Sequence, residues 1–171
     1  MEKALIEFFY QFHRHQHYFL CHDILEDAWK EQPSYSKQDA IVSLILFTTA
    51  SYHHRRHNYK GALKSYKKAL VTICNAVETH QLPLNIEAYQ QLIEEKIYQV
   101  TKQHEFIPIY LPMTSEAELI VKRFHSDYFF EPETLTDDYI IHHHKLRDRS
   151  AVNQARILAK KKKSHNKDFS D

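Results

Sequence analysis

Three side chains of types that take part in catalysis or ligand binding lie close together in one predicted helix. His22 and Glu26 are four residues apart, so they are expected on the same face of the helix, one turn from each other. Such a pair can supply two metal ligands, or a carboxylate that orients an imidazole for proton transfer. Trp29, the only tryptophan, follows three residues later. The spacing is equally typical of a core histidine beside an acid, and a zinc site needs at least three ligands.

The predicted environment of these residues is the hydrophobic core. We expect His22 and Trp29 to be largely buried, because both lie on the apolar stripe of their helix. Glu26 should then accept a hydrogen bond from a histidine, a tyrosine or a backbone N–H, since an unpaired buried carboxylate is costly. His53 is the candidate third ligand. An antiparallel helix hairpin places it about 12 Å along the axis from His22, which is too far for one metal ion.

The remaining histidines near this region form a second candidate cluster. The run His13–His17 (HRHQH) is predicted to break the first helix, and His54 and His57 fall at the same level of the bundle. A metal site at that end is one interpretation. Exposed, flexible histidines are the interpretation we favour.

The composition indicates an α-helical protein. The 171 residues include one glycine and 5 prolines, whereas turn-rich β folds and phosphate-binding loops need many glycines. No Ser/His/Asp or Cys/His catalytic pattern is present. Neither a signal peptide nor an apolar run long enough to span a bilayer is found, so no membrane association is expected. Cys21 and Cys74 are isolated and are predicted to be reduced core thiols of a cytoplasmic protein.

The predicted fold class is all-α, with a single bundle of about five core helices and a helical C-terminal extension. Helical periodicity recurs through residues 1–104, which we assign to the bundle. The stretch 41–57 is rich in β-branched residues, but it is too long for a strand and is predicted to be a helix buried on most faces. Two prolines, Pro108 and Pro112, exclude a helix between them. Residues 105–146 are therefore predicted to form a strap and accessory helices packed on the bundle.

The charges are unevenly distributed. Residues 1–144 carry a net charge of −5, whereas residues 145–167 carry +8. We predict that residues 147–171 form a basic tail, helical or disordered. A run of four consecutive lysines in this tail could contact the phosphates of a nucleic acid. These residues are Lys160, Lys161, Lys162 and Lys163.

The single glycine, Gly61, lies in the first turn of a predicted helix that Asn58 caps. Glycine in that position destabilises a helix relative to alanine. We therefore expect a close approach between two helices at this point, with a large side chain packed against Gly61.

Two segments, FLCHDILEDAWKE and ASYHHRRHNYKGAL, carry a pattern that resembles the bacterial and archaeal family called domain of unknown function 309. The resemblance covers roughly Phe8–Val77. Leu20 and His57 depart from it, because family members often have an acid at the first position and a glycine at the second. The resemblance implies an all-α bundle and a cytoplasmic protein with no established activity. The pattern of the family maps onto Phe19, His22, Glu26, Trp29, Tyr52, His53, Asn58, Gly61 and Ala62. The functional cluster that the resemblance implies consists of seven of these residues: His22, Glu26, Trp29, Tyr52, His53, Asn58 and Gly61.

Three functions are compatible with these observations. The first is a non-enzymatic helical interaction or scaffold protein without a cofactor, which binds a protein partner or forms a homo-oligomer through its aromatic N-terminal helix. The second is a small-molecule or metal site around His22 and Glu26, including a hydrolytic one. The third is nucleic-acid association through the basic tail. The lack of a catalytic signature favours the first.

Overall fold

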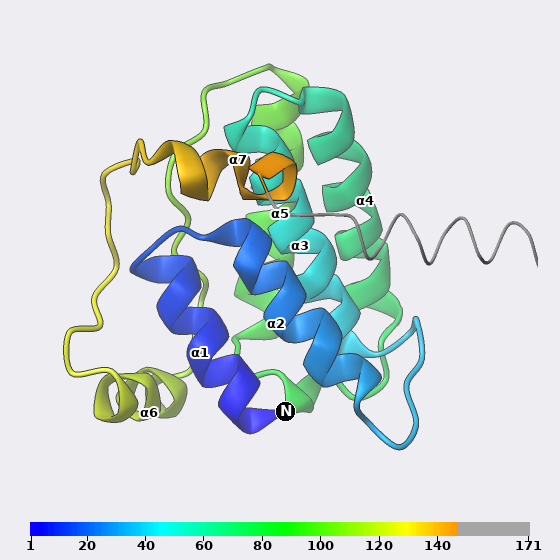
Figure 1. Ribbon diagram of the computed structural model, residues 1–171. Coiled ribbons are helices and arrows are strands. Elements are labelled where there is room, and N and C mark those ends of the chain that lie inside the picture. Colours follow the sequence, from blue (N-terminus) through cyan, green and yellow to red (C-terminus); the bar gives the residue numbers. More distant parts are fainter. Residues whose placement is uncertain (147–171) are drawn as a thin grey trace, which may run out of the picture. The chain divides into compact units, whose positions relative to one another are not determined.

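The computed structural model describes residues 1–146, and its regular elements are helices, which confirms the predicted all-α fold (Figure 1). Among these residues one isolated β-bridge, between Leu84 and Met113, is the only strand-like pairing. The chain divides into two compact units, residues 1–141 and 142–171, and the description below concerns the first. The helices are α1 (Glu2–His13), α2 (Tyr18–Lys30), α3 (Ala40–Arg55), α4 (Tyr59–Asn75), the short 3-10 helix η1 (Thr79–Gln81), α5 (Ile86–Thr101), α6 (Ser115–Phe124) and α7 (Asp138–Leu146).

Helix α3 lies between α2 and α4 and forms the centre of the bundle (Figure 1). Of its 16 residues, 12 are buried, which explains why a segment rich in β-branched residues is helical: tertiary packing outweighs intrinsic propensity. The other positions are spaced four, three and four residues apart, so they form one stripe along one face of the helix. This stripe consists of Val42, Leu46, Thr49 and His53.

The core is aromatic, and two of its buried tyrosines pair their hydroxyls with serines of α3. The hydroxyl of Tyr66 lies 3.1 Å from Ser51 Oγ, and that of Tyr89 lies 3.2 Å from Ser43 Oγ. Burial raises the pKa of both tyrosines, so they remain neutral. These hydroxyl pairs join α3 to α4 and α5 in the middle of the core.

The aromatic face of α1 belongs to this core. Phe8, Phe9 and Phe12 are at most 1% exposed, and Phe12 contacts the ring of Tyr18 at 4.9 Å between centroids. Self-association through these rings, as expected from the sequence, would compete with the packing inside one chain.

His13 is completely buried, so the prediction of an exposed histidine-rich turn is wrong. Its Nε2 accepts a hydrogen bond from the Leu111 backbone N–H (3.0 Å). Its Nδ1 must therefore carry the proton, which it donates to the Tyr128 hydroxyl (2.7 Å). The ring also stacks on that of Tyr110, with 5.0 Å between the ring centroids. His13 thus attaches two segments that lie about a hundred residues later in the chain to the end of α1. His17 and His54 are also buried.

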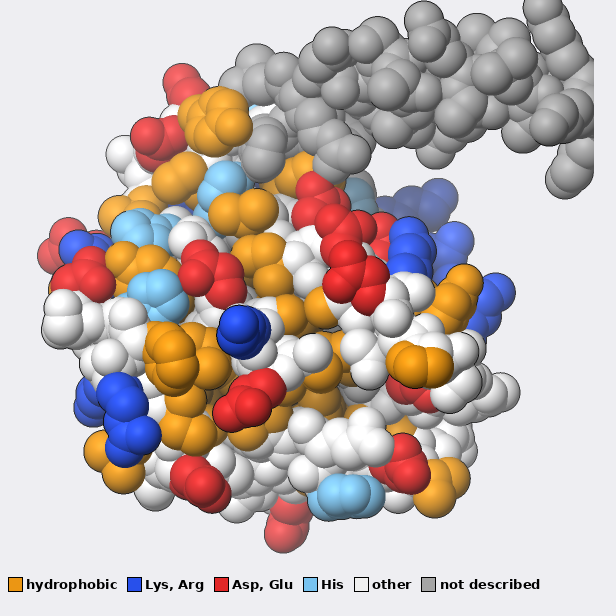
Figure 2. Space-filling model, turned by 60° about the horizontal axis from the view of Figure 1, so that its bottom comes forward, with side chains coloured by type: hydrophobic (Ala, Val, Ile, Leu, Met, Phe, Trp, Pro, Cys, Tyr) orange, Lys and Arg blue, Asp and Glu red, His pale blue; other side chains and the backbone are white. Residues whose placement is uncertain are grey.

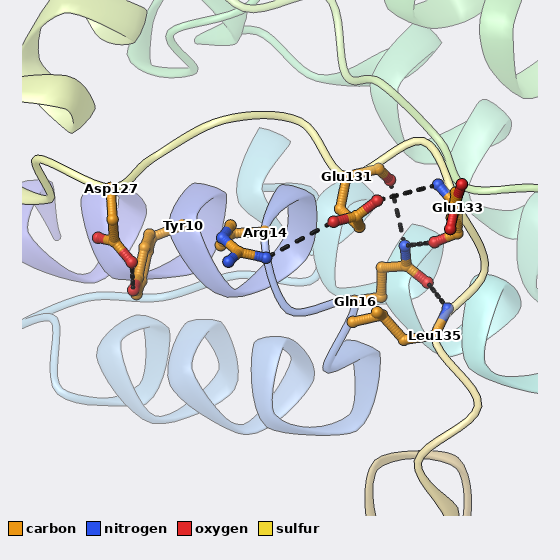
Figure 3. Close-up of polar contacts among 7 residues, drawn as sticks. All are labelled: Tyr10, Arg14, Gln16, Asp127, Glu131, Glu133 and Leu135. Atoms are coloured by element: carbon orange, nitrogen blue, oxygen red, sulfur yellow. Dashed lines mark hydrogen bonds and ion pairs between the residues drawn. The ribbon is translucent and has the colours of Figure 1, made fainter.

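Gln16 fastens the segment that leads to α7 (Figure 3). Its Nε2 donates to the backbone oxygens of Glu131 (3.1 Å) and Glu133 (2.6 Å), and its Oε1 accepts from the Leu135 N–H (3.1 Å). The buried Arg55 of α3 donates to the backbone oxygens of Gln16 and Leu135. The extended segment is therefore held through its backbone. Two side-chain contacts accompany it: the exposed hydrogen bond from Tyr10 to Asp127, and the half-buried ion pair of Arg14 with Glu131.

The two cysteines differ in environment. Cys21 is buried in α2, as expected, but Cys74 is exposed near the end of α4, so its predicted core position is wrong. The core side of that turn is filled by the neighbouring Ile73, which is buried. Within residues 1–146, no helix is long and apolar enough to cross a membrane.

The burial of His13 predicts a pH dependence of stability. Burial lowers the pKa of His13 from 6.5 to about 3, so between these values the unfolded chain binds a proton that the folded chain does not. The free energy of unfolding should therefore fall as the pH falls through this window, by up to about 1.4 kcal/mol per pH unit from this group. His13→Gln should be less stable at pH 7 and show a shallower decline from pH 6 to 4, measured by urea unfolding.

The matched control is His80→Gln, because His80 is exposed. Its pH profile should run parallel to that of the wild type. A His13→Gln profile parallel to the wild type would contradict the assignment of a buried, neutral His13.

Candidate functional site

An open groove of about 610 Å³ runs over the unburied stripe of α3, with α2 on one side and α4 on the other. Its floor is formed by Val42, Ile45, Leu46 and Thr49 of α3. Three of these belong to the stripe that the bundle leaves uncovered. The walls are formed by His22, Glu26 and Trp29 of α2, by Lys67, Lys68, Val71 and Thr72 of α4, and by Lys37 of the loop between α2 and α3.

His22 and Glu26 line this groove. His22 is half-buried rather than largely buried, and Glu26 is paired with a lysine instead of the histidine, tyrosine or backbone donor that the sequence predicted. Their side chains are 27% and 35% exposed. His22 Nδ1 lies 3.2 Å from Asp23 Oδ1, and Glu26 forms an ion pair with Lys30 at 3.1 Å. The carboxylate of Glu26 therefore pairs with Lys30, one turn further along α2. Because this carboxylate is partly exposed to solvent, it needs no buried hydrogen-bond donor.

Trp29 is half-buried at the edge of the same groove. Its indole N–H donates to Asp39 Oδ2 (2.8 Å), which also accepts from the backbone N–H of Ser36 (2.8 Å). The ring packs edge-on against Tyr35 at 5.0 Å. Trp29 therefore fixes the loop between α2 and α3 and shapes one end of the groove.

The described residues contain no group of three or more His, Cys, Asp or Glu side chains arranged to hold a metal ion. His22 and Glu26 therefore have no third protein ligand among them. Phe19 of α2 connects this part of the groove with α3. The centroid of its ring lies 6.4 Å from that of His22 and 5.6 Å from that of Tyr52, which belongs to α3. His53, one residue after Tyr52, belongs to a second cluster.

That second cluster is the junction between α3 and α4. Asn58 caps α4, since its Oδ1 accepts from the Gly61 N–H (3.0 Å). Its Nδ2 donates to His53 Nδ1 (3.1 Å), so the proton of the neutral His53 lies on Nε2. A Cβ at position 61 would lie 2.6 Å from Asn58 Nδ2. Gly61 therefore makes room for the capping amide, and the predicted contact with a large side chain of another helix is wrong.

The residue before the cap, His57, adopts a left-handed conformation with φ of 57°. The His57 N–H bonds to the His54 oxygen and the Asn58 N–H to the His53 oxygen, both at 2.9 Å. This is the hydrogen-bond pattern with which helices commonly end on glycine. The glycine that the resembling family has at this position is explained by this backbone conformation, and His57 occupies it at a conformational cost.

The candidate residues therefore separate into a groove and a junction, connected by the stripe of α3 that ends at His53. Sequence reasoning missed the floor of the groove, above all Leu46, because a predicted helix buried on most faces gave no reason to single out one uncovered stripe. Asp39 was missed as the partner of Trp29, ten residues away.

A second hollow, of about 570 Å³, lies between α1 and α6. Figure 2 brings the base of the Figure 1 view forward, and hydrophobic side chains gather in the middle of that face among charged ones. Leu5 and Ile6 of α1 and Ile120 of α6 line this hollow, but no residue of the predicted functional cluster does. We therefore take the groove over α3 as the candidate site.

Comparisons with known proteins agree with the resemblance in the sequence. Residues 5–65 match the model of the family described as Domain of unknown function (DUF309), a segment that spans α1, α2, α3 and the start of α4. The chain is also similar to "Uncharacterized protein YpuF" of Bacillus subtilis (strain 168), with 32% identity over 95% of this chain and 97% of the relative. No solved structure matches the chain.

The contact between Gly61 and Asn58 predicts a coupled effect on stability. Gly61→Ala should lower the free energy of unfolding by about 1 kcal/mol, because the new Cβ displaces the capping amide. In an Asn58→Ala background the same change should raise it by about 1 kcal/mol, since only the helix preference for alanine remains. A double-mutant cycle measured by chemical denaturation checks this, and equal effects in the two backgrounds would contradict it.

The left-handed conformation of His57 predicts that His57→Gly stabilises the protein by roughly 1 kcal/mol. Little is lost with the side chain, because its ion pair with Glu105 is long (3.7 Å) and exposed. Lys60→Gly, in the first turn of α4, is the control and should destabilise. The midpoints of chemical denaturation measure both effects. An unchanged or lower stability of His57→Gly would show that the contacts of the His57 side chain contribute more to stability than the strain of its backbone costs.

Proposed function

The chain belongs to the DUF309 family, and we propose that it is a non-enzymatic interaction protein that binds a helical segment of a protein partner in the groove over α3. The observation that carries the proposal is the uncovered stripe of α3. A helix that is buried on its other sides leaves Val42 and Leu46 only half-buried, on the floor of a groove that His22, Glu26 and Trp29 border. Apolar side chains grouped at the base of a groove are the usual anchor sites for an amphipathic helix.

The shape of the floor supports a helix as the ligand. Val42, Ile45, Leu46 and Thr49 recur at helical spacing, so the floor presents a row of side chains along α3. The side chains of a partner helix can pack between the side chains of such a row. The half-buried Trp29, held by Asp39, presents a fixed aromatic edge, and such residues often contribute much of the binding energy at interfaces.

The same groove supports one alternative. Its volume is within the range of small-molecule sites, and His22 and Glu26 border it. A small-molecule or metal site, including a hydrolytic one, would be favoured by metal at stoichiometry in the purified protein, or by a metabolite that raises the melting temperature of the wild type but not of His22→Ala. The lysines proposed for nucleic-acid contact, Lys160–Lys163, lie outside the described residues, and that function stays a prediction.

The proposal predicts that Leu46→Arg weakens binding of groove-directed peptides at least about tenfold, because it places a charge at an apolar anchor site. Peptides would be selected from a random display library on the full-length protein, and their affinities measured by fluorescence anisotropy. Val77→Arg introduces the same charge at a residue that is 93% exposed and outside the groove, so it should bind like the wild type.

Two results would overturn the proposal. One is a selection that enriches no peptide at all from a diverse library. The other is a set of enriched peptides that all bind Leu46→Arg and Val77→Arg equally well. Circular dichroism of both variants confirms that the helices are retained, so a loss of binding is assigned to the groove.

A further inference from the structure

The wall of the groove formed by α4 has an unusual charge. The helix carries four lysines, Lys60, Lys64, Lys67 and Lys68, and no acidic residue. All four are exposed, and their spacing of four, three and one residues places them along one side of the helix. Lys67 and Lys68 line the groove. None of the four forms an ion pair with any described residue.

This arrangement is unfavourable for α4 itself. Lys60 lies in the first turn, where the helix dipole disfavours positive charge, and the last turn contains no basic residue. Lys64 lies four residues from both Lys60 and Lys68, and like charges at that spacing repel. Helix α6 shows the favourable order, with Glu116 and Glu118 in its first turn and Lys122 and Arg123 in its last. The lysines of α4 therefore oppose helix stability, which is expected where a surface is used for binding.

The opposite wall does not neutralise this charge. The only acid that lines the groove, Glu26, is paired with Lys30, and Lys37 adds a further cation at the rim. Residues 1–144 carry a net charge of −5, so a basic wall is a local exception on an acidic domain. A ligand in this groove meets an excess of positive charge on one flank and apolar side chains beneath it.

We infer that the partner held in the groove is an acidic amphipathic helix, whose apolar face rests on α3 and whose acidic flank faces the lysines of α4. The inference rests on the proposed function and adds the charge and orientation of the partner. Nucleic acid fits less well, because a phosphate backbone has no apolar side chains for Val42 and Leu46. An acidic flank also predicts attraction at a distance, and therefore association that weakens with added salt.

The test uses two synthetic helical peptides of about 18 residues, long enough for several turns. Both carry leucine and alanine on one face, and one has glutamate where the other has glutamine. We expect the glutamate peptide to bind the full-length chain roughly tenfold more tightly at low salt, with the difference shrinking at high salt. Lys67→Glu/Lys68→Glu should abolish the difference without lowering the melting temperature. Lys3→Glu/Lys102→Glu makes the same change in net charge outside the groove and should preserve it.

Three outcomes overturn the inference. One is equal binding of the two peptides when both are weakened by Leu46→Arg, which leaves the proposed function standing. Another is binding of neither peptide, in which case the library selection shows separately whether the groove binds peptides of a different kind. The third is a single-stranded oligothymidylate that binds the wild type, loses affinity in Lys67→Glu/Lys68→Glu and displaces the glutamate peptide, because the wall would then be a phosphate-binding surface.

Discussion

The enclosure of α3 is the constraint on which the rest of this structure depends. A helix with 12 of 16 residues buried needs neighbours on nearly every side, and α2 and α4 provide two of them while Tyr89 of α5 reaches Phe47 at 5.5 Å. The serine hydroxyls of α3 can be buried because each donates to a backbone oxygen, Ser43 to Ala69 and Ser51 to Phe47. Each of them also pairs with the hydroxyl of a tyrosine from α5 or α4. One stripe of α3, from Val42 to His53, is left without such neighbours. It is only half-buried because α2, α4 and α5 pack against the other sides of the helix.

The helices could be predicted from the sequence because apolar periodicity over a dozen or more residues depends little on distant contacts. The side-chain pairs could not. The spacing of four residues joins His22 to Glu26 and Glu26 to Lys30 equally well, and the structure realises only the second pair. Gly61 illustrates a different failure: the residue that needs the space, Asn58, was already assigned as the cap, but the sequence gives no distance between a missing Cβ and a capping amide.

His13 shows what local reasoning omits. A run of histidines and an arginine suggests an exposed turn, yet the partners that satisfy the ring, Leu111 and Tyr128, lie about a hundred residues away in the sequence. Burying an imidazole is tolerable because each ring nitrogen has one partner of the correct kind, so the neutral tautomer is fully hydrogen-bonded. No pattern within α1 encodes that. The same holds for Gln16, whose amide is matched to the backbone of residues 131–135.

The groove and the junction are mechanically connected. The cap at Asn58, with Gly61 and His53 around it, fixes the residue at which α4 begins relative to the end of α3. Successive residues of an α-helix are separated by about 100° around its axis. A shift of that starting point by one residue would therefore turn Lys67 and Lys68 away from the groove and bring different side chains opposite Leu46. The two halves of the family pattern thus act on one surface: residues of α2 line it directly, and residues of the junction determine which face of α4 completes it.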